Sequence, residues 1–178
     1  MALRLRSARP IDLPAVVALH VASWRDAYRG VLEDGFLAGP IEHSLATHWQ
    51  VVLGAKRRPG AVILATAGRQ VAGFVAAWRE GTNCHVDTLH VRPGMRNAGI
   101  GRALLGLAAT RLQAQGCGSA DLRVFARNPG ALRFCAKLGA ETGPEVLRET
   151  QGQQVLERRA SWADIGALVS ACAVPRAP

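Results

Sequence analysis

HVDTLHVRPGMRNAGIGRALL, residues 85–105, is the stretch of sequence that decides the fold. It predicts a strand that ends at Val91, a loop broken by a Pro-Gly pair, and a helix that begins at Gly99. Gly99 and Gly101 allow backbone amides to approach a ligand closely, and the amides of a first helical turn have no partner within the helix. The positive end of the helix dipole lies at the same turn. The turn therefore predicts a binding site for an anion, and for phosphate in particular.

Three arginines, Arg92, Arg96 and Arg102, add positive charge to this turn. The alternative is a tight strand-to-helix turn in which the glycines serve only sterics. Two other phosphate motifs do not fit the sequence. A Walker loop needs a lysine after its second glycine, and this loop contains none. The glycines also fall in the wrong order for the Gly-x-Gly-x-x-Gly fingerprint of dinucleotide-binding proteins.

A six-residue pattern in the loop, RNAGIG at 96–101, matches the Arg/Gln-x-x-Gly-x-Gly/Ala signature of the GCN5-related N-acetyltransferase (GNAT) superfamily. A second segment, NPGALRFCAKLG at 128–139, resembles the Asn-x-x-Ala-x-x-Phe-Tyr-x-x-x-Gly element of that family. The run from 20 to 30, with Arg9 and Asp12 before it, is also similar to many bacterial members. The resemblance covers most of the chain, which is identified as a member of the superfamily.

The resemblance implies acetyl coenzyme A as cosubstrate and no metal. The glycine-rich loop would bind its pyrophosphate, and the pantetheine would lie along the strand at 89–91 like an added strand. A backbone amide of that strand would polarise the thioester carbonyl. The implied coenzyme contacts are Leu89, His90, Val91, Arg96, Asn97, Ala98, Gly99, Ile100, Gly101, Arg102, Asn128 and Phe134.

The candidate base is Asp87, on the strand before the loop. Strand alternation places His85 on the same face, so His85 is an alternative base, directly or through water. Each also has a structural interpretation, Asp87 as a partner of a neighbouring helix and His85 as a surface residue. His90 is predicted on the opposite face, which makes a metal site of His85 and His90 geometrically poor.

The candidate acid departs from the family pattern, because Cys135 stands where related enzymes carry a tyrosine. Cysteine is a shorter and weaker donor, with a pKa of about 8.5 against about 10 for tyrosine. Three explanations stay open: Cys135 donates, water substitutes, or catalysis is slow or absent. Packing beside Phe134 is the alternative role of Cys135. Trp24 and Tyr28 are candidates for an acceptor pocket, with core packing as the alternative.

Composition fits one domain. The chain has 178 residues, of which 49% are hydrophobic and 20% charged. We expect the domain to span 1–162, followed by a tail at 163–178 with a short helix. The four cysteines show no Cys-x-x-Cys spacing, which predicts reduced thiols. The N-terminus lacks a signal-peptide core and no apolar run is long enough to span a bilayer, so we expect a cytoplasmic protein without membrane contact.

A net charge of +9 raises the alternative of a nucleic-acid-binding module. The basic residues are scattered rather than clustered, and aromatic residues make up only 5% of the chain. Nucleic acid is therefore not the expected partner, although a basic surface favours an anionic coenzyme. The sequence leaves the oligomeric state open, and a homodimer is compatible with it.

Hydrophobic patterning predicts strands and helices in alternation. The predicted strands are 3–7, 61–67, 70–79, one that ends at Val91, 119–125, 146–149 and 154–159. The predicted helices are 13–28 with Asp12 as its cap, 41–53, 99–116, 129–138 and a short one within 163–178. With the resemblance, this order implies an α/β (α+β) domain whose mixed, mostly antiparallel sheet is flanked by helices and splays between its fourth and fifth strands.

The function implied is transfer of an acetyl group from acetyl coenzyme A to a primary amine, on a small molecule or a protein N-terminus. One alternative is a regulatory protein that binds coenzyme A and has little catalytic activity. The sequence does not identify the acceptor.

Overall fold

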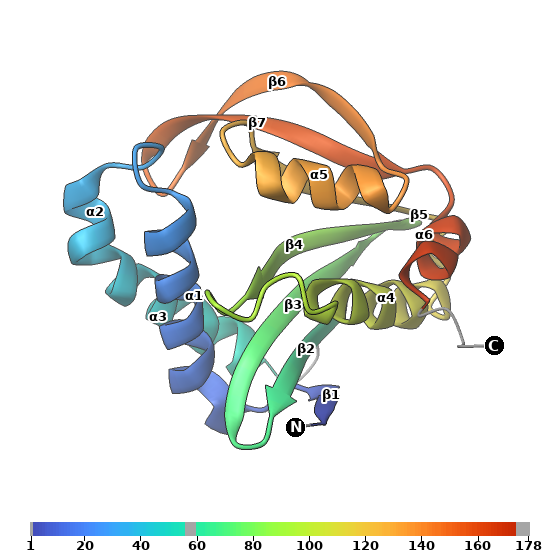
Figure 1. Ribbon diagram of the computed structural model, residues 1–178, viewed down its shortest axis with the longest axis horizontal. Helices are drawn as coiled ribbons and strands as arrows, with labels where there is room; N and C mark the ends of the chain where they lie inside the picture. Colours follow the sequence, from blue (N-terminus) through green and yellow to red (C-terminus); the bar gives the residue numbers. More distant parts are fainter. Residues whose placement is uncertain (1, 56–59, 174–178) are drawn as a thin grey trace.

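A seven-stranded sheet organises the chain, in the order β1-β2-β3-β4-β5-β7-β6 (Figure 1). The computed structural model describes residues 2–55 and 60–173. The strands are β1 Leu3–Ser7, β2 Gly60–Ala67, β3 Gln70–Glu80, β4 Asn83–Val91, β5 Ser119–Phe125, β6 Glu141–Thr150 and β7 Gln153–Trp162. The helices are α1 Leu13–Ala27, α2 Asp34–Ala38, α3 Pro40–Gly54, α4 Ile100–Gln113, α5 Pro129–Lys137 and α6 Ile165–Cys172, with a 3-10 turn, η1 Pro10–Asp12, before α1. Only the β4–β5 pair is parallel among the described strands, which confirms the mixed, mostly antiparallel sheet.

Helices cover both faces of the sheet, and each face has a core of its own (Figure 1). On one face α4 and α6 bury Leu104 and Leu168 against the strands. On the other face α1 and α3 pack around Trp49 and Phe74, both 0% exposed. Because both faces are covered, β3 is apolar almost throughout. No helix of the described residues has the length and apolarity to cross a bilayer.

The local patterns predicted most of these elements. Every predicted strand and helix is present, and β1 and β5 have the predicted bounds. The patterns did not predict α2, a helix of 5 residues, and β6 and β7 are longer than expected, at 10 residues each. Both are strands whose outer face meets solvent, so polar residues continue where the apolar pattern stops.

Asp12 is the N-cap residue of α1 by position, but the prediction that its side chain caps the helix is wrong, because that side chain makes no capping hydrogen bond. Its two carboxylate oxygens accept hydrogen bonds from the Arg6 guanidinium at 2.7 Å, and Oδ2 also accepts the backbone N–H of Arg9 at 2.7 Å. These partners, Arg6 first, hold the pKa of Asp12 below its ordinary value, against the opposing effect of burial. Asp12 is also the last residue of the turn η1, and its carboxylate ties β1 to the start of that turn instead.

A β-bulge interrupts the pairing of β3 with β4 at Asp87. Ala76 pairs with Thr88 and Ala77 pairs with Val86, so two neighbours in β3 face residues on either side of Asp87. Asp87 is the extra residue, and it is exposed. A bulge of this kind shifts the alternation of side chains by one position along the rest of the strand.

The bulge places His85 and His90 on the same face of the sheet. Their register partners in β3 are Trp78 and Phe74, which lie four residues apart and therefore on one face. That face is the one covered by α1. The prediction that the two histidines point to opposite faces is wrong, because it assumed an unbroken strand.

The sheet splays between β4 and β5 as predicted. The two strands pair only from Asn83 with Ser119 to Val86 with Leu122. Beyond this point the β5 side of β4 has no strand partner among the described residues, while β5 continues to pair with β7 as far as Phe125. The second half of β4 is therefore an open edge inside the sheet.

The short helix predicted near the C-terminus is α6, which packs against α4. The two helices approach so closely that a Cβ atom at Gly106 would lie 2.7 Å from Cβ of Cys172. Ile165, Leu168 and Cys172 belong to the same core as α4. The rest of the predicted tail, 174–178, lies outside the described residues.

Candidate active site

A cavity of about 870 Å³ lies where β4 and β5 separate. The loop before α4 and the open edge of β4 contribute one part of its lining, which we call the α4 end. Side chains of α1, β5 and β7 contribute another part, which we call the β7 end. α5 adds Asn128 and Phe134 to the lining. The cavity is continuous between the two ends, so a ligand bound at one can meet a ligand bound at the other.

The α4 end is shaped by left-handed backbone. Gly94, Asn97 and Gly99 have φ angles of 83°, 66° and 77°. Gly99 is the N-cap of α4, and no side chain of the described chain caps the first turn of this helix. A helix N-terminus that follows a loop with left-handed residues is suited to hold an anion through backbone N–H groups.

All of the predicted coenzyme residues except Ala98 line the cavity. The predicted residues that line the cavity are Leu89, His90, Val91, Arg96, Asn97, Gly99, Ile100, Gly101, Arg102, Asn128 and Phe134. Ala98 is exposed and is not part of the lining. Arg92 is not part of it either, because its Nε donates to the carbonyl oxygen of Val71 at 3.0 Å. Two of the three loop arginines therefore face the cavity.

Arg96 is positioned by an ion pair. Its Nη1 lies 2.5 Å from Oδ2 of Asp26, on α1. Both side chains are more than two fifths exposed, at 41% and 47%, so the pair contributes little to stability. The contact joins the loop to α1 and holds one cation beside the N-terminus of α4.

The open edge of β4 packs against α4 and α5. A Cβ atom at Gly101 would lie 3.6 Å from both Val91 and Phe134, so a methyl group fits there but a larger side chain would displace the phenyl ring. Asn128 caps α5 by accepting the backbone N–H of Ala131 at 3.1 Å. These contacts fix the edge of β4 next to the start of α4.

A cluster of buried aromatic side chains holds His90. Its Nδ1 lies 2.8 Å from the Ser23 hydroxyl, and its Nε2 accepts the indole N–H of Trp24 at 3.3 Å. Because Nε2 accepts, the proton of the neutral ring lies on Nδ1. Burial, with a smaller effect of Arg96, lowers the pKa of His90 to about 3. The side chain of His90 is thus a neutral structural group, and only its backbone belongs to the open edge.

His20 occupies the same cluster, as a core histidine. Its Nδ1 accepts the indole N–H of Trp49 at 2.9 Å, and its ring centroid lies 4.4 Å from that of His90. Its Nε2 and the Thr88 hydroxyl are buried without a hydrogen-bond partner in the described chain. Burial lowers the pKa of His20 well below its ordinary value, so this ring is neutral as well.

His85 is held by a buried carboxylate, Asp121 on β5. His85 Nδ1 lies 3.3 Å from Asp121 Oδ2, which also accepts from Arg159 Nε at 3.1 Å, and Asn83 donates to Oδ1. Asp121 raises the pKa of His85. Burial opposes ionisation of Asp121, but hydrogen bonds from His85, Asn83 and Arg159 lower its pKa overall. The sequence analysis did not single out Asp121, although it is the only charged residue on β5 that is buried.

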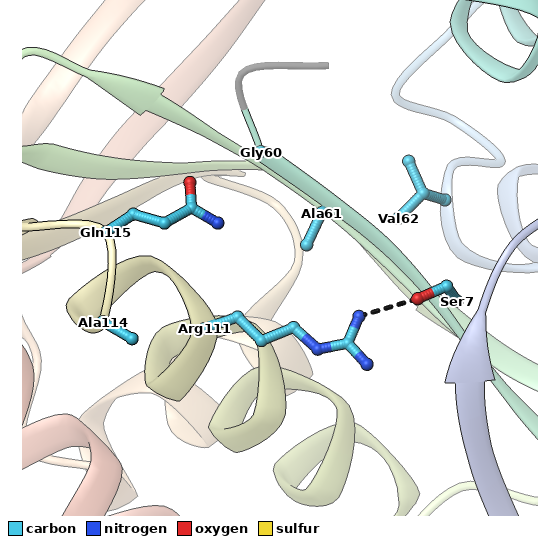
Figure 2. A pocket seen from close by; sticks show the side chains of 7 residues that line it. All are labelled: Ser7, Gly60, Ala61, Val62, Arg111, Ala114 and Gln115. Atoms are coloured by element: carbon cyan, nitrogen blue, oxygen red, sulfur yellow. Dashed lines mark hydrogen bonds between the residues drawn. The ribbon is translucent and has the colours of Figure 1, made fainter. Parts of the chain in front are cut away.

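A second hollow, of about 410 Å³, lies at the outer edge of the sheet between β2 and α4 (Figure 2). Arg111 Nη1 donates to the Ser7 hydroxyl at 2.9 Å in this hollow. Apart from Arg111, its lining carries no charged side chain. It has none of the predicted site residues, so the cavity between β4 and β5 is the candidate active site.

Comparison with known proteins agrees with this geometry. Residues 20–140 match the Acetyltransferase (GNAT) family. The chain belongs to the GNAT family. Among curated relatives, the "Uncharacterized N-acetyltransferase YuaI" of Bacillus subtilis is 24% identical over 92% of this chain and 95% of the relative. The "Probable N-acetyltransferase Rv2775" of Mycobacterium tuberculosis is 29% identical over 60% of this chain, and the match spans 63% of that relative's length.

Among solved structures, the PaiA N-acetyltransferase of Thermoplasma acidophilum in complex with coenzyme A has the same fold. It aligns with a TM-score of 0.73 at 19% identity, and the alignment covers 89% of this chain and 98% of that one.

Cys135, at the position of the tyrosine in the GNAT element, is 1% exposed and belongs to the core on the α4 face. Burial raises the pKa of its thiol to about 12. All four cysteines of the chain are free and buried. Cys135 contributes to the cavity lining, but its thiol is a much weaker acid than an exposed cysteine.

Tyr28, the one tyrosine of this GNAT protein, lies at the β7 end of the cavity. Its ring centroid is 4.4 Å from that of Phe125 and 5.3 Å from that of Trp24. Burial raises the pKa of Tyr28 to about 12, opposed by a hydrogen bond with the Asn128 side chain. Both residues predicted for an acceptor pocket, Trp24 and Tyr28, therefore line the cavity.

Glu157, at the β7 end, is a second buried carboxylate, after Asp121, that the sequence analysis did not single out. It is 7% exposed and lines the cavity from β7. Its signal in the sequence is weak but present: Val155, two residues earlier on the same face, is buried, so alternation places a carboxylate on an inward-facing position.

Proposed function

We propose that this protein is an N-acetyltransferase that transfers the acetyl group of acetyl coenzyme A directly to a primary amine. The observation that carries the proposal is the continuous cavity, which joins the uncapped N-terminus of α4 to the open edge of β4 and to the pocket of Trp24 and Tyr28. Both substrates of a direct transfer need to occupy one cavity at the same time.

The residues at the α4 end fit the coenzyme. Its pyrophosphate would meet the amides at Gly99 to Gly101 and the cations of Arg96 and Arg102. Its pantetheine would add to the open edge at Leu89 to Val91 through backbone hydrogen bonds. The PaiA structure from Thermoplasma acidophilum contains coenzyme A in a protein of this fold, which supports the assignment. The coenzyme supplies an activated thioester, so the proposed reaction uses no metal.

We assign the base role to Asp87. It is the bulge residue at the start of the open edge, it is exposed, and it lines the cavity. The amine acceptor has to lose a proton before or during attack on the thioester carbonyl, and a carboxylate at this position can take it directly or through water. His85 is the second candidate, because Asp121 orients its ring and it also lines the cavity.

We assign the proton of the departing thiolate to water rather than to Cys135. The thiol is in the cavity lining but is almost fully buried, and burial raises its pKa to about 12. It is therefore a poor proton donor at neutral pH, and packing against Phe134 accounts for its position.

Isothermal titration calorimetry with coenzyme A and a free-thiol release assay with a panel of primary amines test the function. We expect stoichiometric binding of the coenzyme and turnover with at least one amine class, such as an alkylamine, an amino acid or a peptide N-terminus. Coenzyme binding without turnover on any amine would favour the regulatory alternative. Absence of binding would overturn the assignment of the α4 end.

A further inference from the structure

Glu157 is a buried carboxylate without a cationic partner. It is 7% exposed, and none of the ion pairs among the described residues includes it. The arginines that follow it in the chain are engaged elsewhere: Arg158 pairs with Glu145 at 2.9 Å, and Arg159 pairs with Asp121 at 3.1 Å. Burial of a carboxylate without such a partner is costly, and a protein retains it mainly where it serves a function.

One oxygen of the Glu157 carboxylate accepts a hydrogen bond and the other accepts none within the described chain. The Thr150 hydroxyl donates to Glu157 Oε1 at 3.0 Å, and no other hydrogen bond to the carboxylate is present within the described chain. Among the described residues, only His20 Nε2 and Thr88 Oγ1 are side-chain atoms that are both fully buried and without a hydrogen bond. Glu157 Oε2 has no hydrogen bond and is not one of them, so it is partly exposed. Since Glu157 lines the cavity, its second oxygen is accessible from there.

Aromatic faces surround the same position. Phe125 is the register partner of Glu157 across the β5–β7 pair, so the two side chains lie next to each other on one face of the sheet. Tyr28 packs on Phe125 with ring centroids 4.4 Å apart, and Trp24 packs on Tyr28. Aromatic faces and a carboxylate both attract a cation, and together they are typical of sites that bind substituted ammonium groups.

Two side-chain hydrogen bonds connect the β6–β7 turn to the helices near the β7 end. The Gln153 side chain accepts the backbone N–H of Glu33 at 2.7 Å, and the Ser44 hydroxyl donates to Gln151 at 2.5 Å. These bonds tie the turn to the segment of α2 and α3, so β7 is held against the helices that cover the β7 end of the cavity (Figure 1). The cations that line the cavity elsewhere include Arg96, which is paired with Asp26, and Arg123, which is exposed on β5.

We propose that Glu157 binds the ammonium group of the acceptor, between its free carboxylate oxygen and the rings of Tyr28 and Phe125. The inference rests on the proposed function and narrows its substrate class: the acceptor enters as a protonated amine, and neutral or anionic compounds of the same size are discriminated against. Glu157 is thus a residue of the proposed acceptor site, in the same cavity as the coenzyme.

Binding of a ligand that cannot be acetylated tests this inference independently of acetyl transfer. Benzyltrimethylammonium carries a permanent cation and no transferable proton, and benzyl alcohol is a neutral probe of similar size. We expect calorimetry with the coenzyme-A-loaded protein to show binding of the cation in preference to the alcohol. Glu157→Gln keeps the hydrogen bond with Thr150 and removes the charge, and it should weaken binding of the cation about tenfold or more. Glu149→Gln, an exposed carboxylate on the same hairpin, is the matched control and should bind as the wild type does.

The outcomes distinguish the inference from the proposed function. Equal affinity of wild type and Glu157→Gln for the cation, or no preference of the wild type for the cation over the alcohol, would overturn the inference even if amines are acetylated. Cation binding that depends on Glu157 would support it even if no amine were acetylated, in which case the proposed function alone would fall. Thermal unfolding of each variant verifies that it is folded, and Glu157→Asp, which retains the charge, should recover part of the affinity if charge rather than shape is responsible.

Discussion

The two ends of the cavity differ in the groups that they offer to a ligand. The α4 end offers mainly backbone groups, from the left-handed turn at Gly99, the uncapped first turn of α4 and the open edge of β4. The β7 end offers side chains, from Tyr28 on α1, Phe125 on β5 and Glu157 on β7. A site made of backbone needs one continuous segment of sequence, whereas a site made of side chains needs distant segments to meet.

Because of this difference, the two ends are suited to different kinds of ligand. Backbone amides at a helix N-terminus bind any phosphate group of suitable size, so the α4 end is suited to a ligand that many proteins share. A buried carboxylate and aromatic rings select by charge and shape, so the β7 end is suited to a ligand of particular charge and size. The bulge residue Asp87 lines the same cavity, at the junction between the paired half and the open half of β4.

The largest effect is expected at this junction. Asp87→Asn should lower kcat for amine acetylation about 100-fold or more, because the side chain can no longer take the amine proton. Coenzyme binding should be unchanged, since the α4 end is intact. The acidic limb of the pH profile of kcat/KM should flatten. His85→Gln is the companion variant: if it flattens the limb and Asp87→Asn does not, the base is His85.

A variant of the backbone-built end should remove the coenzyme and spare the fold. In Gly101→Leu the added side chain has to displace Phe134 or Val91, which lie 3.6 Å from its Cβ position. We expect calorimetry to show coenzyme A affinity reduced about 100-fold, close to 3 kcal/mol of binding free energy. Gly35→Leu, at an exposed glycine with open surroundings on α2, is the control. Normal affinity in Gly101→Leu would mean that this turn does not hold the pyrophosphate.

The sequence predicted the α4 end in detail, because its determinants are local. The glycines, the strand before them and the start of the helix after them lie within residues 85–105. The splay of the sheet was predicted from the resemblance to the GNAT superfamily. No local pattern in β4 or β5 specifies where their pairing stops.

The sequence did not predict the bulge or the β7 end, for a different physical reason. A bulge is defined by the partner strand, and HVDTLHV alternates as an unbroken strand does when it is read alone. Asp121 and Glu157 are buried acids whose partners and neighbours, such as His85 and Phe125, come from other strands. Each looks like an ordinary solvent-facing residue until the register of the sheet is known.

A smaller effect is expected on the pH dependence of the unfolding free energy, through protonation of His85. The hydrogen bond with Asp121 raises the pKa of His85 in the folded protein. The free energy of unfolding should therefore be largest below the ordinary pKa of histidine, about 6.5, and should fall as the pH rises through the folded-state value. We expect a fall on the order of 1 kcal/mol in urea unfolding experiments. His85→Gln still donates to Asp121 but does not titrate, so its unfolding free energy should lack this step. If the unfolding free energy of the variant falls with pH in the same way, another group causes the fall.

The smallest effect is expected at Cys135, where the GNAT tyrosine is missing. The thiol is 1% exposed in the core on the α4 face, so Cys135→Ala leaves a small cavity and should cost about 1 kcal/mol of unfolding free energy. Turnover should change by no more than about threefold, because a thiol with a pKa raised to about 12 gives little general-acid catalysis at neutral pH. Free-thiol release measured alongside coenzyme affinity decides between the roles. A severe loss of turnover with unchanged affinity would make Cys135 the acid and would contradict the assignment of that proton to water.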